Sequence, residues 1–149
     1  MKSHGLTYEE HTVGAVYRTL GRTVSEADIC AFVNLCGFNE PLFMDMEYVA
    51  KESVFKGRAA PGAMTFCLSE GLIMQTGLIH GTGMSYLGSE IRIVAPVLQG
   101  DTLKVGVTIT DKRETRKPAS NSTPAARYSG RRDFGITYRM ADPSYARSS

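Results

Sequence analysis

The sequence predicts an α+β fold in which an antiparallel sheet wraps around one long, buried central helix. Helix patterns are concentrated in the first half of the chain and strand patterns in the second half, an order typical of α+β domains. In addition, the run 63–76 is apolar or small on nearly every face, which is typical of a helix buried on most sides. With 149 residues, of which 42% are hydrophobic, the chain is expected to form a single domain over 1–149.

The first half of the chain begins with a strand and a capped helix. Residues 13–19 alternate as a strand. Ser25 then precedes a helix, and Asp28 places a carboxylate in its first turn. One apolar face of this helix follows at the spacing i, i+3, i+4, i+7, formed by Ile29, Phe32, Val33 and Cys36. Gly37 is expected to end the helix.

Two further helices are predicted before the strands begin. Asp45 is a plausible cap for a short helix at 46–51. Pro61 suits the start of the long apolar helix, because its missing N–H would have no partner in the first turn. Gly77 is expected to end that helix.

Three strands are predicted in the second half. The segment 85–94 alternates in part, with Ile91 and Ile93 on one face, and 127–140 is a weaker strand. The segment 102–112 alternates most cleanly, and its apolar face is formed by Leu103, Val105, Val107 and Ile109. The intervening loop, 114–126, is long enough to indicate function or mobility. The polar ends, 1–10 and 142–149, are expected to be flexible.

Composition argues against several classes of protein. A net charge of +2 does not favour nucleic acid as a partner. The cysteines Cys30, Cys36 and Cys67 form no CxxC pair, so we expect buried free thiols, no metal site and no cofactor. We find no signal peptide and no long apolar run, so we expect a cytoplasmic protein that does not contact a membrane.

Four segments, taken together in this order, resemble the MaoC-like dehydratases, which include (R)-specific enoyl-CoA hydratases. They are VSEADI at 24–29, GFNEPLFMD at 37–45, FKGRAAPGAM at 55–64, and IRIVAPV at 91–97 followed by GDTL at 100–103. The resemblance covers about 12–140 and implies the hotdog fold, a homodimer, and a substrate carried as an acyl-CoA or on an acyl carrier protein.

The same resemblance places a substituted catalytic loop at 37–45. In this family the loop typically reads Gly-Asp-x-Asn-Pro-x-His, and its Asp and His handle the water and the proton during hydration of an enoyl thioester. Aligned on Gly37 and Pro41, the Asp position is Phe38, the Asn position is Glu40 and the His position is Phe43. Neither Phe carries a proton, so the role of the dyad does not transfer.

Three residues are candidates for catalysis. The resemblance implies that the Gly62 N–H, at the start of the central helix, polarises the thioester carbonyl. The alternative is that Pro61 and Gly62 simply begin a helix. Glu40 and Asn39 are the candidates to replace the dyad, because desolvation beside the two Phe rings would raise the pKa of Glu40. The alternative for Glu40 is an ordinary solvated carboxylate.

Several residues are candidates for substrate binding. An apolar acyl pocket would be lined by Phe38, Phe43, Met44, Pro61 and Met64, although core packing explains Met64 equally well. His80 either reaches the substrate or is a surface-turn histidine. Basic side chains at 113–117 and 131–132 either contact the carrier or belong to a solvated hairpin tip.

Three functions therefore stay open. The first is a hydratase or dehydratase, a lyase acting on an acyl thioester with an altered active site. The second is a repurposed isomerase or cyclase of specialised metabolism that uses the same pocket. The third is a non-catalytic acyl-binding subunit that pairs with an active homologue.

Overall fold

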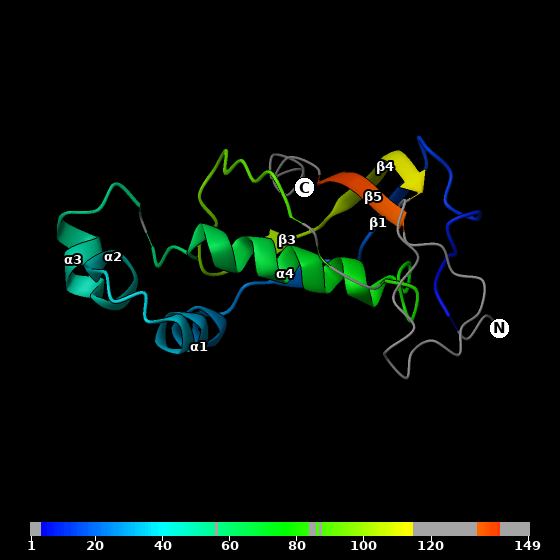
Figure 1. Ribbon diagram of the computed structural model, residues 1–149. Helices are drawn as coiled ribbons and strands as arrows, with labels where there is room; N and C mark the ends of the chain where they lie inside the picture. Colours follow the sequence, from blue (N-terminus) through cyan, green and yellow to red (C-terminus); the bar gives the residue numbers. More distant parts are fainter. Residues whose placement is uncertain (1–3, 56, 84–85, 87, 115–133, 141–149) are drawn as a thin grey trace. The chain divides into compact units, whose positions relative to one another are not determined.

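The computed structural model describes residues 4–55, 57–83, 86, 88–114 and 134–140. Its elements are strands of two to nine residues, one long helix and three shorter helices (Figure 1). In chain order they are β1 (Val16–Arg18), β2 (Arg22–Thr23), α1 (Glu26–Cys36), α2 (Pro41–Met44), α3 (Met46–Lys51), α4 (Gly62–Gln75), β3 (Thr102–Leu103), β4 (Gly106–Glu114) and β5 (Phe134–Met140).

These elements divide between two compact units. The sheet unit is built from the described parts of Met1–Thr19, Ile73–Gly88 and Gly106–Ala141. The helical unit is built from Leu20–Leu72 and Ser89–Val105. The prediction of a single domain stays a prediction.

The sheet unit contains a three-stranded antiparallel sheet in the order β1-β4-β5. In its register Val16 pairs with Thr108, and Val107 pairs with Met140. The buried face of β4 carries Val107 and Ile109, as their period-two spacing requires. A register shift between Ile109 and Asp111 interrupts the pairing of β4 with β5.

The start of the chain, which we expected to be flexible, makes defined contacts in the sheet unit. The Gly5 N–H donates to the His80 carbonyl at 2.6 Å, and the Leu6 N–H donates to the Leu78 carbonyl at 2.8 Å. The Lys112 ammonium, on β4, donates to the backbone carbonyls of Tyr8 and His11 at 3.2 and 2.8 Å. These bonds connect the first described residues with both the turn after α4 and the sheet.

The helical unit is assembled around backbone pairing that joins distant segments. β2 and β3 pair antiparallel, with Arg22 opposite Leu103. An isolated bridge joins Ala59 to Leu98, so the segment that leads into α4 is also held by the chain near 98. The core of this unit is aliphatic and is formed by Val24, Ile29, Val33, Val49, Ala59, Met64, Val97 and Leu103.

Local capping chemistry sets the helix ends as predicted. Ser25 and Asp28 form a capping box at the start of α1, and Gly37 ends α1 in the left-handed region with φ 69°. Asp45 caps α3, where its carboxylate accepts from the Glu47 and Tyr48 N–H groups at 2.9 and 3.0 Å. The helix α2, which begins at Pro41, was not predicted.

The long helix α4 is less buried than its composition suggests. Met64, Leu72 and Ile73 lie in the core, but Cys67 is exposed and Met74 is 53% exposed. The expected helix, buried on most sides, is therefore found at the right place but with an open face. An apolar side chain indicates only a tendency to be buried, and the residues that the structure describes do not cover every face of α4.

Two other predictions are corrected. Residues 89–94 contain no strand, and Ile91 and Ile93 are 51% and 55% exposed. The cysteines are not all buried: Cys36 and Cys67 are exposed and Cys30 is half-buried. A period-two pattern needs a pairing partner to become a strand, and the described residues place none beside 89–94.

The last two strand predictions are confirmed in part. The predicted strand 102–112 is interrupted between β3 and β4, although its apolar face is buried as expected. β5 falls within the predicted strand 127–140, whose first part lies outside the described residues, as does nearly all of the loop 114–126. In the described part of the chain, no helix is both long and apolar enough to cross a membrane.

Candidate functional site

The segment 37–45, which the motifs single out, is a compact double turn in the helical unit. The Phe38 N–H donates to the Val33 carbonyl at 3.0 Å, so the segment leaves α1 directly. Pro41 then starts α2, where its fixed φ suits the first helical position. The Asp45 N–H closes the turn on the Pro41 carbonyl at 2.9 Å.

An aromatic cluster forms the inner side of this segment. The rings of Phe38 and Phe43 meet edge to face, with centroids 6.2 Å apart and planes at 73°. Phe38 also contacts Phe32 of α1, at 5.8 Å between centroids. Contacts of this kind are each worth about 0.5–1.5 kcal/mol beyond the buried area. The structure therefore brings together the two Phe residues that the motif aligns with an acid and a base.

The polar candidates on the same segment face solvent. Glu40 and Asn39 are both exposed, and so is Met44. Phe38 packs on Phe32 of α1, and the exposure of the Glu40 side chain agrees with the solvated alternative. Glu40 here is a solvated carboxylate at the start of α2.

The second part of the candidate site is the beginning of α4. Gly62 is the first residue of this 14-residue helix, so its N–H lies at the positive end of the helix dipole. A Cβ at Gly62 would lie 3.1 Å from the Ile93 side chain, which makes the position tight. Pro61 and Met64 are fully buried on either side of it.

Arg58 is a functional candidate that the sequence reasoning missed. Its side chain is only 10% exposed, and its guanidinium forms an ion pair with Glu26 of α1, at 3.0 Å. The same guanidinium donates to the backbone carbonyl of Phe43 in the candidate loop. The signal available in the sequence was a single Arg among small and apolar residues at 57–61, where a buried cation requires partners.

Other predicted residues fall outside the described part of the helical unit. His80 belongs to the sheet unit, in the turn after α4, with an exposed side chain. Its contact with a substrate stays a prediction. The basic residues Arg116, Lys117, Arg131 and Arg132 lie outside the described residues.

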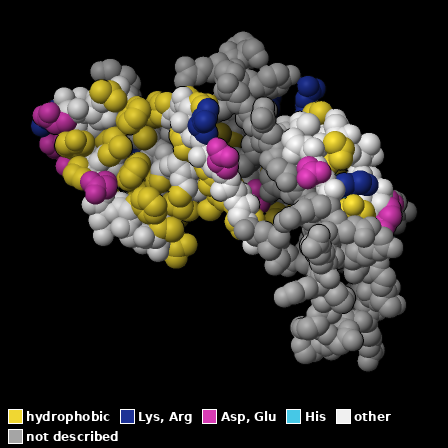
Figure 2. Space-filling model, turned by 45° about the horizontal axis from the view of Figure 1, so that its top comes forward, with side chains coloured by type: hydrophobic (Ala, Val, Ile, Leu, Met, Phe, Trp, Pro, Cys, Tyr) yellow, Lys and Arg dark blue, Asp and Glu magenta, His cyan; other side chains and the backbone are white. Residues whose placement is uncertain are grey.

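Exposed apolar side chains gather near the loop. Figure 2 shows hydrophobic side chains gathered over the part of the molecule that holds α1, α2 and α3. Large hydrophobic side chains that are exposed between residues 35 and 54 are Leu35, Met44, Met46, Tyr48 and Val54. A hollow of about 150 Å³ opens in the same unit, lined by Met46, Val49, Ala50, Phe55 and Gly57. Among the described residues, no group of His, Cys, Asp or Glu is arranged to hold a metal ion.

The combination of antiparallel strands with helices is α+β, and similar solved structures place it in the hotdog class. A family model described as "MaoC like domain" matches residues 9–126, and this chain belongs to that family. The match includes both the loop 37–45 and Gly62.

Curated relatives carry the names of the same family. The chain is 30% identical to Protein MaoC from Klebsiella aerogenes over 130 residues, which are 87% of this chain and 38% of that protein. It is 35% identical to an (R)-specific enoyl-CoA hydratase from Rhodospirillum rubrum over 94 residues, 62% of each chain. The chain thus spans less than two thirds of the length of either relative.

A solved structure agrees with this assignment. The chain is similar to the crystal structure of the MaoC-like dehydratase from Rhodospirillum rubrum, with a TM-score of 0.65 and 30% identity. The similarity covers 75% of each chain. The α+β hotdog class that the sequence predicts is therefore confirmed.

Proposed function

We propose that this protein is a lyase of the hydratase or dehydratase type that acts on an acyl thioester through an altered active site. The observation that carries the proposal is the family match over residues 9–126. A relative named (R)-specific enoyl-CoA hydratase supports the reaction class. In this proposal Phe38 and Phe43 occupy the positions of the family's catalytic Asp and His.

The carbonyl oxygen of the thioester would be held at the start of α4. Addition of water to an enoyl thioester pushes electrons onto that oxygen, and a hydrogen-bond donor there stabilises the enolate. The Gly62 N–H lies at a helix N-terminus, whose positive dipole suits a developing anion. Because this donor is a backbone group, replacement of the neighbouring side chains does not remove it.

Glu40 would provide the proton transfers. Its carboxylate takes a proton from water as the oxygen bonds to the β-carbon, and the π electrons move toward the carbonyl. The protonated Glu40 then gives its proton to the α-carbon, so that one water molecule is added in total. Asn39 would orient the water. Binding of the substrate would also exclude solvent from Glu40, which is exposed in the isolated chain.

The apolar candidates would contact the acyl chain. We assign this role to Phe38, Phe43, Met44, Pro61 and Met64. The carrier would be coenzyme A or an acyl carrier protein, and the active form would be a homodimer. The apolar surface over α1–α3 supports an assembly, since large exposed apolar patches mark interaction sites (Figure 2).

The reaction is tested with crotonyl-CoA and with crotonyl groups on an acyl carrier protein. We expect the full chain to consume the enoyl absorbance of one of these thioesters. Glu40→Gln is expected to lower kcat/KM by about 10²-fold, the usual size of a general acid–base contribution. Glu47→Gln, which neutralises another exposed Glu on the neighbouring helix, is the matched control and should leave kcat/KM unchanged.

Absence of turnover with both thioesters would overturn the proposal. Equal rates for wild type and Glu40→Gln would remove Glu40 from the mechanism while leaving the reaction class intact. The double change Phe38→Asp with Phe43→His tests independently whether these positions correspond to the family's catalytic Asp and His. We expect the double variant to hydrate the enoyl thioester faster than the wild type.

A second candidate function is an acyl-binding subunit without catalysis. The edge-to-face packing of Phe38 and Phe43, together with the exposure of Glu40, favours it. Tight binding of a saturated acyl-CoA by a protein with no turnover would support this candidate.

A further inference from the structure

Arg58 is a charged residue that lies buried in the helical unit. Its side chain is 10% exposed, whereas Arg is rarely so buried without specific partners. The residues beside it, Ala59 and Ala60, are buried and apolar. Burial of a cation is costly, so the contacts of this guanidinium have to offset that cost.

The guanidinium joins two segments that are separate in sequence. Its Nη2 and Nε lie 3.0 and 3.1 Å from Oε1 of Glu26, in the first turn of α1. Its Nη1 donates to the Phe43 carbonyl, near the end of α2. The planar fork of Arg presents several donors in fixed directions, so the two partners are held in one geometry.

The backbone of Arg58 is fixed as well. Its carbonyl accepts from the Gln99 N–H at 2.9 Å, and the Ala60 N–H donates to the Val97 carbonyl at 2.8 Å. Four residues after Arg58 comes Gly62, the first residue of α4. Backbone and side chain together therefore connect the start of α4 with the loop that carries Asn39 and Glu40.

We propose that Arg58 is a positioning residue that holds the loop 37–45 in register with the Gly62 N–H. This inference rests on the proposed function. In that function the carbonyl of the substrate must lie at the Gly62 N–H while its attacked carbon lies at Glu40, so the distance between the loop and the start of α4 has to be fixed. Arg58 does not touch the reacting atoms. It acts through the Phe43 peptide and, through the Phe43 ring, on Phe38.

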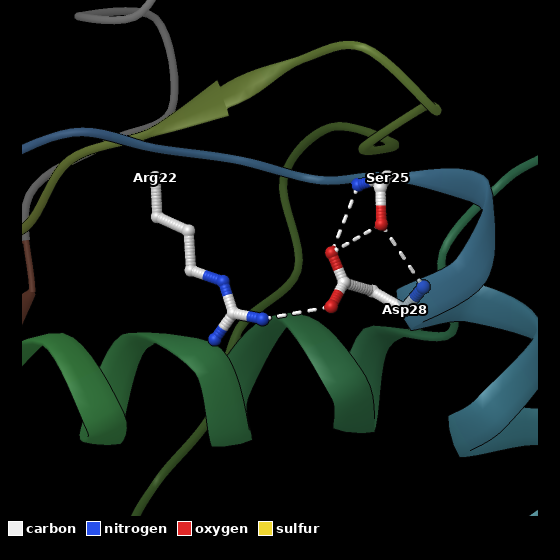
Figure 3. Close-up of polar contacts among 3 residues, drawn as sticks. All are labelled: Arg22, Ser25 and Asp28. Carbon is white, nitrogen blue, oxygen red and sulfur yellow. Dashed lines mark hydrogen bonds and ion pairs between the residues drawn. The ribbon is translucent and has the colours of Figure 1, made fainter.

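The chain offers a matched control at the same helix. Arg22 also pairs with a first-turn carboxylate of α1, Asp28, at 2.8 Å (Figure 3). Its side chain is 41% exposed, and its bond ends on α1 instead of bridging to the loop. Arg22→Met therefore removes an ion pair of the same type without removing the connection to Phe43.

The first test is amide hydrogen exchange of the full chain, read by mass spectrometry. In Arg58→Met, we expect amides of the loop 37–45 to exchange about tenfold faster or more, as loss of a charged hydrogen bond implies. Amides of β4 should be unchanged. Arg58→Lys should restore part of the protection, since an ammonium can serve one of the two partners. Arg22→Met should leave the loop as in wild type.

Unchanged exchange in the loop of Arg58→Met would overturn the proposal, and so would a uniform increase over the whole chain. The uniform result would mean that Arg58 contributes only to global stability. If Arg58→Met does not fold, the amide exchange rates of the loop and of β4 are compared in Arg58→Lys and Glu26→Gln instead.

The second test separates this proposal from the proposed function. If the wild type hydrates an enoyl thioester, Arg58→Met should lower kcat at least about tenfold with KM within about twofold, because alignment and not binding is lost. If kcat is unchanged while the loop exchanges faster, the positioning role is wrong. If the wild type is inactive, the exchange experiment still decides whether Arg58 fixes the loop, and the failure belongs to the proposed function.

Discussion

Asp28 receives three hydrogen bonds at the start of α1. Its carboxylate accepts from the Ser25 N–H at 2.9 Å, from the Ser25 hydroxyl at 2.8 Å and from Arg22 at 2.8 Å (Figure 3). The bonds from Ser25, followed by the charge of Arg22, lower the pKa of Asp28 below its ordinary value of 3.8. The ionised form is therefore favoured by folding.

This shift predicts how stability depends on pH. A carboxyl whose pKa is lowered by folding contributes stability above its unfolded pKa and loses it as pH falls through the folded value. Asp28→Asn should therefore lower the free energy of unfolding by about 1 kcal/mol at neutral pH, and the difference should shrink in acid. Urea denaturation at neutral pH and near pH 3 measures both values. A difference that does not change with pH would contradict the role of the charge.

Single residues were predictable where their partners are close in sequence. Ser25, Asp28 and Asp45 were recognised because a helix cap involves groups two or three residues apart. Arg58 was not, since its partners lie 32 and 15 residues away and one of them is a backbone carbonyl. For Glu40 the sequence left a desolvated and a solvated carboxylate open, and the structure places its exposed side chain at the start of α2.

At the scale of the element, α3 depends on its cap. This helix has only six residues, and Asp45 satisfies two of its first N–H groups. Asp45→Ala should therefore lower the free energy of unfolding by about 1 kcal/mol. Asp45→Ser, which keeps an acceptor, should recover most of it. Because Asp45 is exposed, lost packing does not confuse the comparison, which denaturant titration can make. Equal losses for Ala and Ser would argue against capping.

The segment 102–112, which is divided into β3 and β4, shows what an alternating pattern of apolar residues does not predict. Leu103, Val105, Val107 and Ile109 are buried as their spacing predicts. Yet β3 pairs with β2, whereas β4 pairs with β1 and β5. Alternation records which side chains are buried, while the pairing partner is chosen by segments far away in sequence. The same reasoning applies to 89–94, where the apolar spacing exists without a strand.

At the scale of the whole molecule, a buried histidine should make stability sensitive to mild acid. Burial and then the charge of Lys112 lower the pKa of His11 below its ordinary value of 6.5, although Glu10 opposes this. Because the unfolded chain binds the proton more readily, stability is complete above about pH 6.5 and falls as pH decreases from there.

His11→Leu should remove this slope, because leucine does not titrate. Thermal unfolding between about pH 7.5 and pH 5 measures it as a change of Tm with pH, and His4→Gln, the removal of an exposed histidine, is the control. A wild-type slope that survives in His11→Leu would assign the acid sensitivity to other groups.

The fold class was predictable because the family frame extends over most of the chain, and the match over 9–126 includes segments of both units. The arrangement of the candidate site was predictable only in part. The motif located the loop and the start of α4, but the bond that connects them runs through a side chain outside the aligned catalytic positions.

The aromatic cluster of Phe32, Phe38 and Phe43 also has an optical consequence. The chain contains 0 Trp, so its near-ultraviolet signal comes from seven Tyr and six Phe. A tryptophan placed at position 38 would be the sole indole in the protein, packed between two neighbouring rings. The wavelength of its fluorescence emission would report opening or closing of the loop. Because the protein has no other tryptophan, no second indole would contribute to that signal.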